Sequence, residues 1–169
     1  IVPVSSVTGD GIPTFLETLQ AICKAVPERK QTGLFRLPVD RVFTMKGFGT
    51  VITGSLVSGM IAVGETIMIY PSRIKSKVRG IQVHNQSRET AEAGMRTAIN
   101  FQGLEKEAVN RGDVLASPGS LRSSYMIDLD LTYLESLKKP IKNRVRVRFH
   151  TGTSEILGVL VFFDTEEIA

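Results

Sequence analysis

The densest group of chemically capable side chains lies between residues 122 and 150. This segment holds seven basic residues against three acids, and the basic ones are Arg122, Lys138, Lys139, Lys142, Arg144, Arg146 and Arg148. Because alternate residues of a strand project from one face, Arg144, Arg146 and Arg148 predict a guanidinium row whose spacing can follow a phosphodiester backbone. Lys142 and His150 flank this row and extend the candidate RNA contact. The alternative is a solvated strand face that blocks aggregation at a sheet edge.

A complete catalytic constellation is absent from the sequence. It has no G-x-S-x-G, H-E-x-x-H or G-x-x-x-x-G-K-[ST] motif, and the G-F-G at 47–49 does not continue into G-x-G-x-x-G. His150 could serve as a base, but no pattern supplies a nucleophile beside it, so we favour a structural or RNA-contact role. One cysteine and two histidines exclude an internal disulfide and a Cys/His metal site. We expect no cofactor and no enzymatic activity in this chain.

The composition is that of a globular chain with a modest positive charge. The 169 residues are 42% hydrophobic and 22% charged, with a net charge of +4, which fits one ordinary domain or two small ones. No apolar run reaches the roughly 18 residues of a membrane-spanning helix, and no signal peptide is recognisable. We therefore expect a soluble protein without a membrane partner, and the charge permits an acidic partner such as nucleic acid.

The first 33 residues predict a strand, a helix and a linker. The segment at residues 1–6 is typical of a short buried strand, and a turn rich in threonine, glycine and aspartate follows it. Apolar residues then recur at three- and four-residue spacing over 13–26, which predicts a helix with Cys23 on its buried face. Pro27 should end this helix, and the polar residues 27–33 should connect it to the next domain.

The rest of the chain predicts two β domains. Short β-branched runs separated by glycines from Leu34 to Gly119 favour a small barrel. Further on, strands are predicted at 126–134, 144–150 and 155–164 by alternation or by a continuous apolar run. These strands are too few to close a barrel, so we expect an incomplete second barrel whose last strand leaves an unpaired apolar edge.

Three blocks of sequence resemble a known family. They are VFTMKGFGTVITGSLVSGMIAVGETIMIYP, KVRGIQVHNQSRETAEAGMRTAINFQG and VNRGDVLASPG. Together they resemble the second domain, a β-barrel, of the translational GTPases that include elongation factor Tu. VSSVTGDGI also resembles the last guanine-binding element of a G domain, with Ser5, Ser6 and Val7 at the serine-containing position. The resemblance implies a G-domain tail at 1–30, domain II at 33–119 and the start of domain III at 121–169.

Within this superfamily, the chain is most similar to the bacterial selenocysteine-specific elongation factors (SelB). The segments that carry this likeness are FRLPVDRVFT, VRGIQVHNQ, GMRTAIN and KNRVRVRFHTGTSEILG. The resemblance implies a cytoplasmic parent GTPase that uses GTP and Mg²⁺ through upstream motifs and binds the ribosome. It also implies selenocysteyl-tRNA as a partner, and an mRNA element bound by modules that lie beyond this segment.

The resemblance assigns the amino-acid pocket to Asp40, Arg41 and Arg96. In the superfamily, the second domain holds the 3′ end and the amino acid of the charged tRNA at these positions. Elongation factor Tu generally has two acids at the first pair and no strong cation at the third, so this pocket is unusually positive. A selenol is more acidic than a thiol, so esterified selenocysteine is largely anionic at neutral pH whereas serine is neutral. Two guanidinium groups could distinguish the anionic selenocysteine from the neutral serine by this difference in charge.

Two other interpretations stay open at this point. A general elongation or initiation factor would bind a different aminoacyl-tRNA, but it would have no need of both Arg41 and Arg96 in the pocket. A ribosome- or protein-binding module without amino-acid readout would instead depend on Arg144, Arg146 and Arg148.

Overall fold

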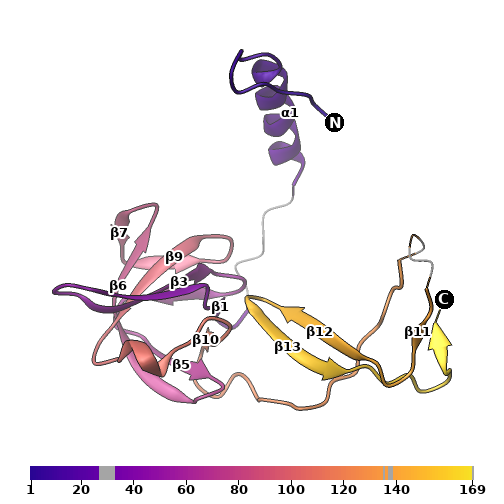
Figure 1. Cartoon of the computed structure of the whole chain (residues 1–169). Coiled ribbons are helices and arrows are strands. Elements are labelled where there is room, and N and C mark those ends of the chain that lie inside the picture. The colour runs from indigo at the N-terminus through magenta and orange to yellow at the C-terminus, as the bar shows by residue number, and fades with distance from the viewer. Residues whose placement is uncertain (27–32, 135, 137–138, 169) are drawn as a thin grey trace. The chain divides into compact units, whose positions relative to one another are not determined.

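The computed structural model describes residues 1–26, 33–134, 136 and 139–168, and the chain forms two compact units, 1–30 and 31–169. The first unit contains helix α1 (Ile12–Ala25), preceded by a tight loop (Figure 1). In that loop, the amide of Ser5 donates to the carbonyl of Asp10 at 3.0 Å and the amide of Gly9 donates to the carbonyl of Ser5 at 2.9 Å. The linker predicted over 27–33 lies almost entirely outside the described residues.

Two predictions for the first unit are wrong. Residues 1–6 form no strand, because no described segment offers them a β partner and an isolated strand leaves its backbone groups unpaired. Helix α1 forms where it was predicted, but its apolar stripe is open to solvent and Cys23 is exposed instead of buried. The helical periodicity correctly predicted an apolar face, and no described residue covers it. None of the described helices is long and apolar enough to cross a membrane.

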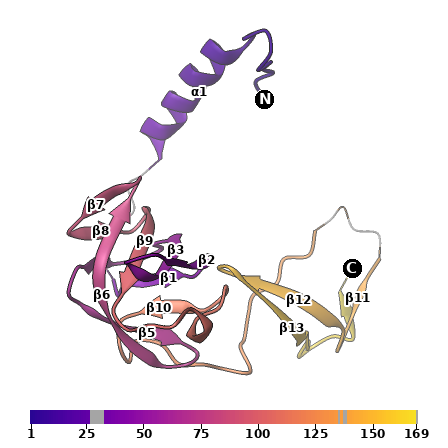
Figure 2. The same cartoon turned by 60° about the vertical axis from the view of Figure 1, so that its left-hand side comes forward.

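The second unit begins with a β-barrel, which confirms the predicted fold class. Its strands are β1 (Arg36–Pro38), β2 (Arg41–Met45), β3 (Gly49–Ser55), β4 (Met60–Ala62), β5 (Thr66–Tyr70), β6 (Ile74–Val83), β7 (Gln86–Arg88), β8 (Thr90–Glu92), β9 (Arg96–Phe101) and β10 (Val114–Ala116). The main sheet has the order β1-β10-β5-β6-β9-β3-β2, with β7 paired to β6 and a separate β4–β8 pair (Figure 2). All these pairs are antiparallel, and a short 3-10 helix, η1 (Lys106–Ala108), precedes β10.

The two end strands of this sheet, β1 and β2, are joined by only two residues, Val39 and Asp40. The sheet must therefore curl until its two end strands meet. We call the junction between β1 and β2 the seam, and Asp40 lies in it. Gly54 of β3 allows the close approach, since a Cβ atom there would lie 2.2 Å from the carbonyl oxygen of Pro38. The seam thus brings the end of β1 against β3.

Alternation along the strands fills a single core. Most strands of the barrel bury one face, and the completely buried large side chains include Leu37, Ile52, Ile67, Ile69, Ile99 and Leu115. The opposite face of β2, β3, β9 and β6 points away from this core and carries Arg41, Thr53 and Arg96. We call this surface the outer face.

The second β segment is smaller than predicted. It contains β11 (Ile141–Lys142), β12 (Arg146–Thr151), β13 (Ser154–Val159) and β14 (Glu167–Ile168), arranged as the pairs β11–β14 and β12–β13. The strand predicted over 126–134 is not formed: Ile127, Leu129 and Leu131 are exposed, and no described strand lies against them. Apolar side chains of β13 and the residues after it are also exposed, as expected for an unpaired edge.

Candidate functional site

Asp40 and Arg96 form an ion pair at the barrel seam. Arg96 Nη2 donates a hydrogen bond to Asp40 Oδ2, joining the residue between β1 and β2 to the first residue of β9. The Asp40 side chain is 24% exposed and the Arg96 side chain 52% exposed, so the pair is accessible to a ligand. The hydrogen bond from Arg96 lowers the pKa of Asp40, with further lowering by the charges of Arg96, Arg41 and Arg111 and an opposing effect of burial.

Arg41 lies on the same face as this pair. Arg41 of β2 pairs in register with Thr53 of β3, and Thr53 pairs with Ala98 of β9. On the same two strands, β3 and β9, Ser55 pairs with Arg96. Directly opposed residues of neighbouring strands project to the same side, so Arg41 and Arg96 flank β3 on the outer face. Between them, the Thr53 hydroxyl is buried and has no hydrogen-bond partner among the residues that the structure describes. The structure therefore gathers the three residues predicted for the amino-acid pocket around one polar group of β3.

Arg111 is a fourth charged residue at this site, and the sequence reasoning missed it. It precedes Gly112, whose amide donates to the carbonyl of Val39 at 3.0 Å, and this bond brings the 110–113 turn beside Asp40. The carboxylate of Asp113 is engaged within the turn, where it accepts from the amide of Asn110 at 2.8 Å. Arg111 stands in the VNRGDVLASPG block that carried the family resemblance, but no periodic pattern connects it to Asp40.

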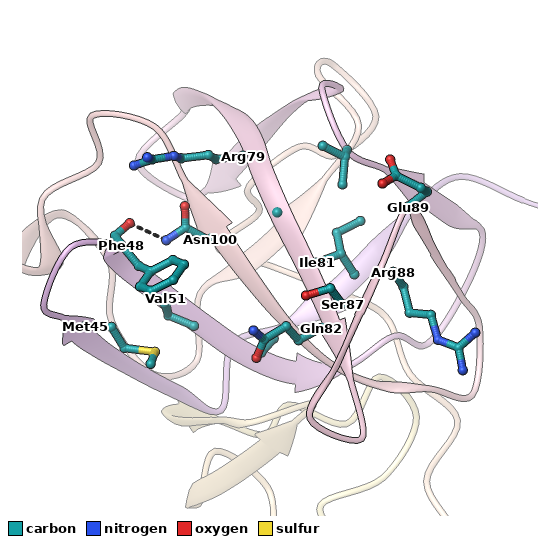
Figure 3. A pocket seen from close by; sticks show the side chains of 13 residues that line it. Met45, Phe48, Val51, Arg79, Ile81, Gln82, Ser87, Arg88, Glu89 and Asn100 are labelled. Atoms are coloured by element: carbon teal, nitrogen blue, oxygen red, sulfur yellow. Dashed lines mark hydrogen bonds between the residues drawn. The ribbon is translucent and has the colours of Figure 1, made fainter.

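A cavity of about 270 Å³ opens on the outer face beyond the ion pair (Figure 3). Its lining includes Met45, Phe48, Val51, Gln82 and Asn100, together with the charged side chains of Arg79, Arg88 and Glu89. Asn100 Nδ2 donates to the carbonyl of Phe48, and the buried Asn100 Oδ1 atom accepts no hydrogen bond within the described part of the chain. A flat, mostly apolar group with a few polar edges suits such a lining.

Strand register relates the cavity to the ion pair. Ala98 lines the cavity and belongs to the same cross-strand row as Thr53 and Arg41, while Asn100 and Val51 form the next row. Arg96 and Asn100 are four residues apart on β9, about 13 Å along the strand. A ligand with a ring in the cavity and a charged group at Arg96 would span this distance.

The predicted guanidinium row at 144–148 is only partly formed. Arg146, Arg148 and His150 alternate on β12, but Arg144 lies in a turn with φ of 60°, outside the strand, which corrects the prediction that it shares their face. Asn143 causes this turn, because its Oδ1 accepts from the amides of Phe162 and Arg144, each at 2.9 Å. Arg148 is paired with Glu155 at 2.6 Å.

The remaining predicted residues make other contacts within their own units. Lys142 is on β11, in register with Glu167 of β14. Ser5 accepts a hydrogen bond from the amide of Thr8 through its Oγ at 3.2 Å, and Ser6 and Val7 are exposed in the same loop.

Known proteins of similar sequence include several translation factors. The family model for elongation factor Tu domain 2 matches residues 49–116. The chain is 47% identical over 168 residues to the selenocysteine-specific elongation factor of Desulfomicrobium baculatum, covering 99% of this chain and 26% of that protein. It is also 30% identical to elongation factor Tu 2 of Streptomyces avermitilis, over 93% of this chain and 44% of that protein.

Solved structures give the same relationship. A bacterial selenocysteine-specific elongation factor superposes with a TM-score of 0.80 at 26% identity, covering 99% of this chain and 28% of that one. The apo form of elongation factor SelB from Methanococcus maripaludis gives a TM-score of 0.75 at 25% identity, covering 98% and 37% of the two chains.

The chain belongs to the elongation factor Tu family of translation factors, and its barrel has the domain 2 fold of that family. Along nearly its whole length it is similar to the selenocysteine-specific members. It spans about a quarter of the length of the Desulfomicrobium relative.

Proposed function

We propose that this chain is the aminoacyl-tRNA-binding part of a longer, GTP-dependent elongation factor that delivers selenocysteyl-tRNA to the ribosome. The observation that carries the proposal is the Asp40–Arg96 ion pair on the outer face of the barrel, with Arg41 beside it. The similarity to selenocysteine-specific factors supports it. The whole factor would be cytoplasmic, would bind GTP and Mg²⁺ through an upstream G domain, and would read an mRNA element through other modules.

The charge balance of the site favours an anionic side chain. Arg41, Arg96 and Arg111 act on Asp40, so three positive charges face one negative charge. A selenolate bound here would compensate part of this excess through charge-assisted hydrogen bonds, and the arginines would in turn lower the selenol pKa. Asp40 would keep Arg96 oriented and would offset repulsion among the arginines before the amino acid arrives.

A neutral serine side chain would be disfavoured at the same site. It would displace water from the guanidinium groups without supplying a counter-charge, and a charge left without its partner in a desolvated site costs about 3–5 kcal/mol. Because Arg96 is half exposed and already bonded to Asp40, we expect a smaller effect here. A preference of about 100-fold corresponds to about 2.7 kcal/mol.

The cavity beside Asn100 is the proposed place for the terminal base of the tRNA 3′ end. Its lining offers an apolar floor and the Phe48 ring, and the distance along β9 lets an ester-linked amino acid reach Arg96. Arg146 and His150 on β12, with Lys142, remain proposed contacts to the RNA. Ser5, Ser6 and Val7 would contribute to the guanine-binding edge of the G domain.

The test uses the full-length factor with a non-hydrolysable GTP analogue. Its affinity for one tRNA, charged with selenocysteine or with serine, is compared before and after Arg96→Ala. We expect the wild type to favour the selenocysteyl form by about 100-fold and the variant to lose most of this preference. Arg148→Ala is the matched control, since its ion pair joins β12 to β13, and it should leave the ratio unchanged.

Equal binding of both charged forms by wild type and variant would refute the readout by the pocket. Specificity would then reside in the body of the tRNA or in another surface. A wild-type protein that binds neither form would instead support a ribosome- or protein-binding module.

A further inference from the structure

The peptide unit that precedes Asp40 is held by three hydrogen bonds. Its carbonyl, from Val39, accepts from the amide of Gly112 at 3.0 Å and from the hydroxyl of Thr153 at 2.6 Å. Its N–H, from Asp40, donates to the carbonyl of Thr53 at 2.8 Å. A peptide plane bonded at both ends cannot rotate, so the Cα of Asp40 has a fixed place and the carboxylate is aimed by few remaining torsions.

Thr153 reaches this peptide from a different part of the unit. It lies in the turn between β12 and β13, more than a hundred residues along the chain, and is partly buried by the contact (Figure 2). Glycines make the approach close: a Cβ atom at Gly152 would lie 3.1 Å from Pro38, and one at Gly112 would lie 3.1 Å from Ser154. The turn therefore fits against both segments that carry charged groups of the site.

We propose that Thr153 is a positioning residue for the aminoacyl site, because its hydroxyl fixes the peptide unit that carries Asp40. The proposal deepens the proposed function and rests on it for the role of the site. Without this hydroxyl, the carbonyl of Val39 keeps its bond to Gly112, so the barrel should stay folded. Asp40 would gain freedom, and its hydrogen bond with Arg96 would be formed for a smaller fraction of the time.

The hydrogen bond from Thr153 constrains the position of Asp40 and contributes little to the stability of the barrel. Thr153 touches the barrel at the seam, whereas the barrel core lies between its own strands. In the wild type, the hydrogen bond from Arg96 is the main cause of the low pKa of Asp40. A readout at the Asp40 carboxyl thus reports positioning, and a thermal unfolding curve reports stability.

The test measures the Asp40 carboxyl pKa by NMR titration in this chain for wild type, Thr153→Val and Thr153→Ser. Valine keeps the branched shape and removes the donor, and serine keeps the donor. We expect the pKa of Asp40 to rise toward its ordinary value in the valine variant and to stay low in the serine variant. Thr151→Val, at an exposed position of the same hairpin, is the control and should leave the pKa unchanged.

A second perturbation keeps the hydroxyl and moves the turn. Gly152→Ala places a methyl group against Pro38 at a residue whose φ is 57°, so it should also raise the pKa of Asp40. An unchanged Asp40 pKa in both Thr153→Val and Gly152→Ala, with the chain folded, would overturn the proposal.

In the full-length factor, Thr153→Val should reduce the preference for selenocysteyl- over seryl-tRNA by about fivefold, the effect of one neutral hydrogen bond. If Arg96→Ala leaves this preference unchanged, the proposed function fails, while the NMR titration still decides whether Thr153 positions Asp40.

Discussion

Gly54→Ala should damage both the barrel and its site. A Cβ atom at residue 54 would lie 2.2 Å from the carbonyl oxygen of Pro38 and 2.5 Å from Leu37 Cδ2. Leu37 is completely buried and cannot move aside, so the backbone of β1 must shift away from β3. Overpacking costs about 1–3 kcal/mol, and a collision with backbone belongs at the upper end.

The expected loss of about 3 kcal/mol in the free energy of unfolding corresponds to a fall in Tm of about 12 °C or more for a small domain such as this barrel. Circular dichroism measures this Tm. Gly80→Ala is the matched control, since a Cβ atom at this β6 position meets nothing within 4 Å. The same shift would displace the residues just before Asp40. A Gly54→Ala protein whose Tm stays within about 2 °C of wild type would refute the argument that this close approach closes the barrel.

Two further predictions concern charge and exposure. Asp40 has a lowered pKa in the folded state, so its contribution to stability is present above its ordinary pKa and is lost as the pH falls through the folded value. Arg96→Ala should therefore lower the free energy of unfolding in urea by up to about 1 kcal/mol at pH 6, with no difference near pH 2; an equal loss at both pH values would contradict this sign. Because Cys23 is exposed, it should react with a thiol reagent in the native chain as fast as in denaturant, and marked protection would show that another surface covers α1.

Elements that bury one face were predicted well from the sequence. Each glycine-separated run between Leu34 and Gly119 contains a strand, because alternation against a core fixes both the strand and its register. The failures are segments without a partner. Residues 126–134 alternate between polar and apolar side chains, and the N-terminal residues are mainly apolar, so both segments have side chains that suit a strand. A strand also needs a neighbouring strand to pair with, and the local sequence does not encode that neighbour.

The site residues were predicted mainly from the family resemblance, and the periodicity of the side chains contributed little. Arg96 lies 56 residues after Asp40 in sequence, and only the order of strands brings it beside β3. Arg111 was missed because a backbone hydrogen bond between Gly112 and Val39 brings it to the site, and no side-chain periodicity reports such a bond. Arg144 was misplaced for a related reason: the Asn143 side chain forms a turn where alternation alone predicts a strand.

The pairing of β1 with β10 has a consequence for how the protein folds. Leu37 pairs with Leu115, so this contact closes a loop of nearly 80 residues, whereas β2–β3, β5–β6 and β6–β7 are hairpins with short connections. Pairs that are distant in sequence form slowly, because the entropy of the intervening chain must be lost first. On a translating ribosome, β1 must wait until β10 has been synthesised. Since Asp40 lies between β1 and β2, the proposed aminoacyl site would be assembled late, and a chain with an unfinished barrel would lack the complete proposed site.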